Sequence, residues 1–235
     1  MNATQIGTAA AVLSFAASIA VASPVLAAPG ALAAPAALTA PAALVGPGTG
    51  YITTGGIEDL TACSFAAVGY DAGGRLVGLT AGHCVLSPGL PVTLVENPGA
   101  GPVGVTVSGH WGPDYGVVEL DPAKVIPVSS RGGITVTDIG PTFPGRPVCK
   151  IGVATATTCG TVLDVRPDTD IVTGTPTLWA DSGGALVSGT TLVGIASHAD
   201  SVPVLSPTVY ASAAESLARL NARGGTGAGF RPIGS

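Results

Sequence analysis

From residue 51 to about residue 210 the hydrophobic residues fall in short runs separated by Gly, Pro and Asp. The runs are rich in Val, Ile and Thr, which favour β-strands, and Asp71-Ala72-Gly73-Gly74 between two of them is a turn signal. Short strands with such frequent turns predict an all-β sandwich or barrel. The expected strands form two groups: 64–70, 75–80, 91–95, 103–107 and 115–120, then 134–137, 148–152, 159–165, 184–187, 192–197 and 208–210.

One helix is expected near the C-terminal end. Ser212 and Glu215 have capping-box spacing, Leu217 and Leu220 share a helical face, and Gly224 follows as a stop. We expect this helix to pack on the second group of strands. The Gly-rich residues 223–235 after it are predicted to be a disordered tail.

The N-terminal region carries no acidic or basic side chain before Glu58. Residues 1–28 contain a long apolar run with small residues near its end, which predicts a signal peptide. Because no Lys or Arg precedes the run, an uncleaved anchor stays open as an alternative. The Ala/Pro/Gly-rich residues 29–50 are interpreted as a linker or a short pro-segment.

Composition excludes several functions. The net charge is −5 and the nine cationic residues are scattered, which argues against a nucleic-acid surface. The four cysteines allow three pairings, and none lies in a Cys-x-x-Cys motif. With only three histidines besides, no zinc site and no cofactor are expected.

Three short stretches carry candidate chemistry. Ser182 lies in Asp181-Ser182-Gly183-Gly184, His83 ends the apolar run that includes Thr80-Ala81-Gly82, and Asp114 begins the run Tyr115-Gly116-Val117-Val118. A serine hydroxyl becomes nucleophilic when a histidine takes its proton and a carboxylate orients that histidine. Alone, Ser182 would equally fit an ordinary turn. Together, the three predict a catalytic triad of Ser182, His83 and Asp114.

These motifs resemble those of the chymotrypsin-like serine proteases. The compact bacterial secreted branch, typified by streptogrisins and alpha-lytic protease, looks closest, and the resemblance covers residues 51–222. It implies two antiparallel β-barrels, at about 51–125 and 130–222, followed by the C-terminal helix. It also implies the disulfides Cys63–Cys84 and Cys149–Cys159.

The resemblance extends to the substrate site. It implies an oxyanion hole formed by the backbone N–H groups of Ala180 and Ser182, although the family normally has glycine where this chain has Ala180. It implies that Ser197 steadies Asp114, and that Asp181 is buried beside a cation. The candidate cations are Lys150, Arg146 and Arg131, and the implied pocket walls are Pro176, Thr177, Leu178, Ser197, His198 and Ala199.

The resulting expectation is a secreted, extracellular or wall-associated, monomeric endopeptidase that acts on protein or peptide substrates. No acidic residue stands at the implied pocket floor, so small or medium apolar residues are the expected preference, with acidic residues a minority alternative through His198. No membrane partner is expected unless the N-terminal segment is retained. Two rival hypotheses remain: a non-catalytic binding module, suggested by Ala180, and a tethered adhesion protein, suggested by the uncharged N-terminal region.

Overall fold

The computed structural model describes residues 42–54, 60–166, 170–199 and 207–235. All of them belong to one compact unit of the chain. The predicted signal peptide and most of the predicted linker lie outside the described residues. Within the described part, no helix has the length and apolar character needed to cross a membrane.

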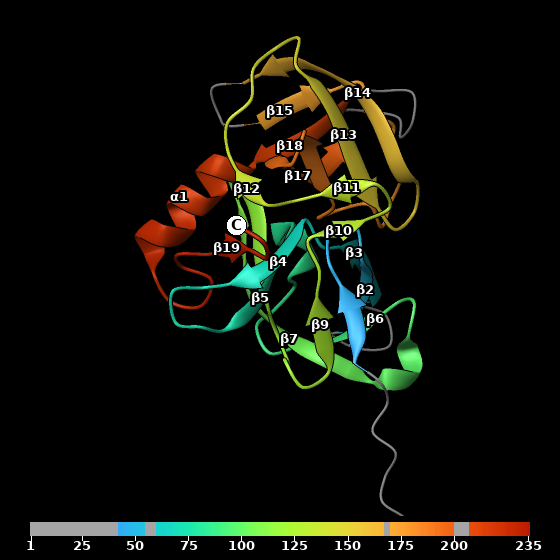
Figure 1. Ribbon diagram of the computed structural model, residues 1–235, viewed down its shortest axis with the longest axis vertical. Coiled ribbons are helices and arrows are strands. Elements are labelled where there is room, and N and C mark those ends of the chain that lie inside the picture. Colours follow the sequence, from blue (N-terminus) through green and yellow to red (C-terminus); the bar gives the residue numbers. More distant parts are fainter. Residues whose placement is uncertain (1–41, 55–59, 167–169, 200–206) are drawn as a thin grey trace, which may run out of the picture. The chain divides into compact units, whose positions relative to one another are not determined.

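The first group of strands forms an eight-stranded sheet, shown in blue to green in Figure 1 with the final strand in red. Its order is β19-β4-β5-β8-β7-β6-β2-β3, and all its pairings are antiparallel. The strands are β2 (Gly50–Thr54), β3 (Leu60–Ser64), β4 (Ala67–Tyr70), β5 (Leu76–Thr80), β6 (Pro91–Leu94), β7 (Pro102–Trp111), β8 (Asp114–Leu120) and β19 (Arg231–Pro232).

The second group forms a seven-stranded sheet in the order β12-β17-β16-β13-β14-β15-β18, and pairing of β17 with β18 closes six of the strands into a barrel. The strands are β12 (Asp138–Ile139), β13 (Pro147–Gly152), β14 (Ala156–Val165), β15 (Asp170–Thr173), β16 (Ala185–Ser188), β17 (Thr191–Ala199) and β18 (Thr208–Ser212). The predicted all-β fold is thus confirmed, with a closed second barrel and a first sheet that remains open at β3 and β19.

Smaller elements lie outside the two sheets. Strands β1 (Ala43–Val45) and β9 (Val125–Pro127) pair in parallel, and β10 (Ser130–Arg131) pairs with β11 (Ile134–Thr135). Short 3-10 helices occur at η1 (Gly82–Cys84) and η2 (Pro98–Ala100). Because β1 and the start of β2 lie within 29–50, the C-terminal part of the predicted linker is folded and the linker boundary was wrong.

The helix α1 (Ala213–Arg223) forms where the capping pattern predicts it. The Ser212 side chain accepts a hydrogen bond from the Glu215 N–H, and Gly224 follows the helix with φ 73°. Leu220 is buried, and the helix packs on β17 and β18 of the second barrel. Its position agrees with the prediction.

The segment after α1 is ordered, so the predicted disordered tail is wrong. Strand β19 pairs with β4, and Phe230 is buried in the core. The carboxylate of Asp71, which belongs to a predicted turn, is buried and accepts hydrogen bonds from the Gly227 N–H (2.9 Å) and from Arg75 Nε (2.7 Å). Burial opposes its ionisation, but these hydrogen bonds outweigh it and lower the pKa of Asp71.

Candidate active site

His83 is held at the carboxyl end of β5, within the short helix η1. The next residue, Cys84, forms a disulfide with Cys63 of β3. Gly82 lies so close to the backbone of His110 that a Cβ there would collide with the His110 carbonyl oxygen. The disulfide and this close packing together fix the peptide that carries the imidazole.

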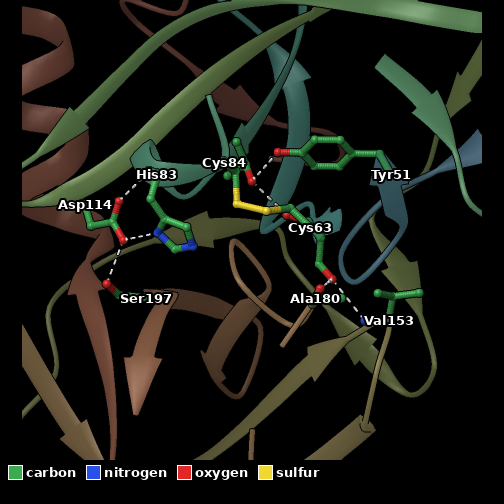
Figure 2. Close-up of a disulfide and its surroundings, with 10 residues drawn as sticks. Tyr51, Cys63, His83, Cys84, Asp114, Val153, Ala180 and Ser197 are labelled. Carbon is green, nitrogen blue, oxygen red and sulfur yellow. Dashed lines mark hydrogen bonds and ion pairs between the residues drawn. A yellow bond between two sulfur atoms is a disulfide. The ribbon is translucent and has the colours of Figure 1, made fainter. Parts of the chain in front are cut away.

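Asp114 begins β8 and binds His83 at two points. Its Oδ2 atom lies 2.7 Å from His83 Nδ1, and its Oδ1 atom accepts the His83 backbone N–H at 3.0 Å (Figure 2). Burial alone would raise the pKa of Asp114, yet the hydrogen bonds and charge of His83 and the hydroxyl of Ser197 lower it. The carboxylate therefore stays ionised and favours a proton on Nδ1, which leaves Nε2 as the acceptor nitrogen.

Ser197 donates its hydroxyl to Asp114 Oδ2 at 2.6 Å, as the resemblance implied. The strand β17 has a bulge between Ala196 and His198, where its register with β18 shifts. Such a bulge re-aims the side chains of consecutive residues. Here Ser197 Oγ also lies 3.0 Å from His198 Nδ1, and both residues line a groove together with His83, Asp114, Asp170 and Trp111.

Trp111, which sequence reasoning did not single out, ends β7 beside the histidine. Its ring centroid lies 6.0 Å from that of His83, and 78% of the residue is exposed. The preceding residue, His110, is partly buried, and its ring centroid lies 4.8 Å from that of Tyr115. Burial and the nearby Arg223 lower the pKa of His110.

Ser182 lies in the loop before β16. Its carbonyl oxygen accepts the Ser64 N–H at 2.7 Å, and the next N–H, that of Gly183, is donated to the Ala196 carbonyl at 2.7 Å. Gly183 has φ 83° and packs against Thr80 and Ser64 so closely that a Cβ would collide. In the described residues the Ser182 hydroxyl forms no hydrogen bond with His83, and in unliganded enzymes such bonds are often long.

Asp181, next to Ser182, is fully buried and paired with Lys150 of β13, one of the three predicted cations. The Lys150 Nζ and Asp181 Oδ2 atoms are 2.8 Å apart, and both side chains are 0% exposed. Asp181 also accepts the hydroxyl of Thr155 (2.6 Å) and the N–H groups of Ala154 (2.9 Å) and Leu178 (3.0 Å). Burial lowers the pKa of Lys150, while for Asp181 these donors outweigh burial and lower its pKa as well.

The other two candidate cations interact with residues other than Asp181. Arg131 binds Glu96, with Nη2 2.7 Å from Oε1, and Arg146 donates from Nε to the Ser188 hydroxyl at 2.7 Å. Lys150 is therefore the cation of the Asp181 pair.

Ala180 adopts the backbone conformation that explains why glycine is usual at its position. Its φ is 74°, and the turn around it is closed by the Asp181 N–H, which is donated to the Leu178 carbonyl at 3.1 Å. A positive φ at the third residue of a turn normally selects glycine. For an alanine this left-handed conformation costs about 1–2 kcal/mol.

Ser64, the last residue of β3, contacts this turn and was missed at the sequence level. Its hydroxyl donates to the Ala180 carbonyl at 2.8 Å and accepts the Val153 N–H at 2.9 Å. Ser64 is 0% exposed and directly follows Cys63 of the disulfide. Figure 2 shows Cys63 of the disulfide together with Ala180 and Val153. No local pattern marks it, because its partner is 116 residues away.

The predicted pocket residues lie in different surroundings. Ser197 and His198 line the groove in front of His83, Leu178 is 44% exposed, and Thr177 is buried with its hydroxyl bonded to that of Thr208. The Pro176 carbonyl accepts the Thr158 hydroxyl at 2.9 Å, and the Ala199 side chain lies outside the described residues.

A network of buried hydroxyls lies next to Thr177. Thr173 and Tyr210 both bond to Thr175, at 2.7 and 2.6 Å, and the Thr208 hydroxyl is donated to the Thr175 carbonyl at 2.8 Å. Burial raises the pKa of Tyr210, so its phenol stays neutral. This buried network is therefore polar but uncharged.

The cysteines form both disulfides that the resemblance implied, Cys63–Cys84 and Cys149–Cys159. Among the described residues, one group has metal-ligand spacing: Cys63, His83 and Cys84, whose ligand atoms lie within 4.8 Å of one another. Because both sulfurs are joined in the disulfide, they offer no thiolate to a metal.

No family model matches the sequence, and no curated protein matches it either. Solved structures do match. Protease A of Thermobifida fusca is 22% identical with a TM-score of 0.62, covering 75% of this chain and 96% of its own. Nocardiopsis protease is 26% identical with a TM-score of 0.61, covering 76% and 97%.

A third match is the chymotrypsin of Cellulomonas bogoriensis, which is 24% identical with a TM-score of 0.58 and covers 82% of this chain and 100% of its own. All three are bacterial proteases, and each matches over nearly its whole length. The described chain therefore has the fold of bacterial chymotrypsin-like serine proteases, as its three sequence motifs predict.

Proposed function

We propose that the protein is a secreted serine endopeptidase that hydrolyses peptide bonds through Ser182, His83 and Asp114. The observation that carries this proposal is the double hydrogen bond between Asp114 and His83, at 2.7 and 3.0 Å. It fixes the imidazole of His83, whose neighbour Cys84 is joined by the disulfide to Cys63. The next residue, Ser64, ties the loop of Ser182 to the first sheet. These are the parts that acyl transfer by a serine requires.

In the proposed reaction His83 Nε2 takes the proton of Ser182 as Oγ attacks the scissile carbonyl carbon. Asp114 stabilises the imidazolium that forms, and its lowered pKa keeps it ionised throughout. The backbone N–H groups of Ala180 and Ser182 donate to the developing oxyanion. His83 then gives the proton to the leaving amine, and water hydrolyses the acyl-enzyme by the same route.

We propose a preference for small or medium uncharged residues before the cleaved bond. The interior behind Thr177 holds buried hydroxyls that bond to one another, with no carboxylate among them. A buried Lys or Arg side chain of a substrate would lack a counter-charge there, which is costly.

The alternative of a non-catalytic binding module rests on Ala180. The left-handed φ of 74° supports catalysis instead, because alanine takes the conformation that glycine would take. Secretion is supported by the two disulfides, which persist in oxidising compartments.

The proposal is tested by incubating the purified, disulfide-intact protein with an unfolded protein substrate and locating the cleaved bonds by mass spectrometry. We expect internal cleavage after residues such as Ala, Val or Thr, and none with the Ser182→Ala variant. Cleavage mainly after Lys or Arg would overturn the proposed preference. A folded wild-type protein that cleaves nothing would favour the binding module.

A further inference from the structure

The peptide between Ala180 and Asp181 is held at both of its polar groups. Its carbonyl oxygen accepts the Ser64 hydroxyl at 2.8 Å, and its N–H is donated to the Leu178 carbonyl at 3.1 Å. With this plane fixed, the torsions φ and ψ of Ala180 decide where the preceding peptide, and with it the Ala180 N–H, points. That N–H is one of the two proposed oxyanion donors.

From this geometry we infer that Ser64 is a positioning residue that holds Ala180 in its left-handed conformation and so keeps the oxyanion hole formed. The inference rests on the proposed function of the site. Glycine would occupy a φ of 74° without help, whereas alanine disfavours it and must be held by its surroundings. Ser64 supplies that restraint from β3 of the first sheet.

The surroundings make the Ser64 hydroxyl hard to replace. Ser64 is 0% exposed, and its hydroxyl is shared between the Ala180 carbonyl and the Val153 N–H. Val153 stands in the turn after β13 beside Ala154, whose N–H binds Asp181. A single hydroxyl thus links the turn at Ala180 to the turn after β13, which binds Asp181.

The backbone of Ser64 anchors the same loop separately. Its N–H is donated to the Ser182 carbonyl at 2.7 Å, and its own carbonyl accepts the Thr80 hydroxyl at 2.9 Å. These bonds do not need the Ser64 side chain. A Ser64→Ala variant therefore removes the restraint on Ala180 while keeping the anchor of Ser182.

The test is a double-mutant cycle of Ser64→Ala and Ala180→Gly, with kcat and KM measured on one peptide substrate. We expect Ser64→Ala alone to lower kcat about 100–1,000-fold, the loss of one oxyanion donor, with KM nearly unchanged. In the Ala180→Gly background the same change should lower kcat less than about threefold, because glycine needs no restraint. Equal losses in both backgrounds would overturn the inference.

Thr53→Val is the matched control. Thr53 lies in β2 of the same sheet, is 0% exposed, and its hydroxyl has no hydrogen-bond partner among the described residues. Removing this buried hydroxyl should leave kcat unchanged. A loss in Thr53→Val as large as in Ser64→Ala would mean that any hydroxyl removed from this sheet disturbs the site, and would count against a specific role for Ser64.

A crystal structure of Ser64→Ala separates failure of this inference from failure of the proposed function. If the wild-type protein proves to have no peptidase activity, the proposed function fails, while the φ of Ala180 in the variant still tests Ser64. We expect that φ to leave the left-handed region in Ser64→Ala. A φ that stays near 74° would overturn the inference, whatever the activity.

Discussion

The histidine half and the serine half of the candidate site are held by different interactions. His83 and Asp114 both come from the first sheet and are fixed by a disulfide and by hydrogen bonds that reach a partly exposed groove. Ser182 stands beside Asp181, which is fixed by an ion pair that is 0% exposed. We therefore expect changes in the histidine half to affect catalysis far more than stability, and changes in the serine half to affect both.

The largest expected effect is on the histidine half. Asp114→Asn replaces the carboxylate that selects the Nδ1 tautomer of His83, so kcat should fall on the order of 10⁴-fold. The midpoint of thermal unfolding should fall only modestly, by far less than the loss in activity. Asp121→Asn is the control, because Asp121 only caps a turn through the Ala123 N–H and should keep full activity. A tenfold or smaller loss in Asp114→Asn would contradict the assigned role.

The serine half is tested by Lys150→Met. This change leaves Asp181 buried without its cation and should lower the free energy of unfolding by about 3–5 kcal/mol, with activity lost as well. The matched control is Arg219→Met on α1, which breaks the exposed pair with Glu215 and should cost less than about 1 kcal/mol. Chemical denaturation measures both, and equal losses would refute the stabilising role assigned to the buried Lys150–Asp181 pair.

Acid should weaken the fold through the carboxylates of both halves. The pKa values of Asp114 and Asp181 are lowered in the folded protein, so the unfolded chain binds protons first as the pH falls. The free energy of unfolding should therefore decline most steeply from about pH 4 downwards, where unfolded aspartates titrate. Denaturation curves across this range measure it, and greater stability at pH 3 than at pH 6 would be inconsistent with these shifts.

The smallest expected effect is that of Ser197→Ala. It removes the hydroxyl donated to Asp114 Oδ2 at 2.6 Å, while both bonds between Asp114 and His83 remain. One such bond to a charged group contributes about 1.5–3 kcal/mol at most. We expect kcat/KM to fall about three- to tenfold, measured by steady-state kinetics. No change at all would show that Asp114 is held by His83 alone.

The sequence allowed prediction of the parts that rest on local pattern. Short hydrophobic runs separated by turn residues predict the strands, and capping spacing predicts α1. The motifs around His83 and Asp114 predict that these two residues lie close together. Lys150 could only be named as one of three cations, because choosing among them requires the register of β13 against the loop of Asp181.

The failures of sequence prediction have a common physical cause. Ser64 bonds to a residue 116 positions away, and Asp71 binds the C-terminal segment across 156 positions. Glycine-rich composition predicts disorder for residues 223–235, but it cannot reveal that a buried carboxylate accepts an N–H there. Long-range hydrogen bonds by single side chains leave no periodic signal in the chain.

The central claim, that Ser182 is activated by His83, is tested most directly by labelling the purified protein with a fluorophosphonate probe. Such a probe reacts with an activated serine whatever residue the pocket prefers. The account predicts a single label on Ser182 that disappears in both Ser182→Ala and His83→Ala. A folded protein with both disulfides intact that takes no label, or labelling that persists in His83→Ala, would contradict it.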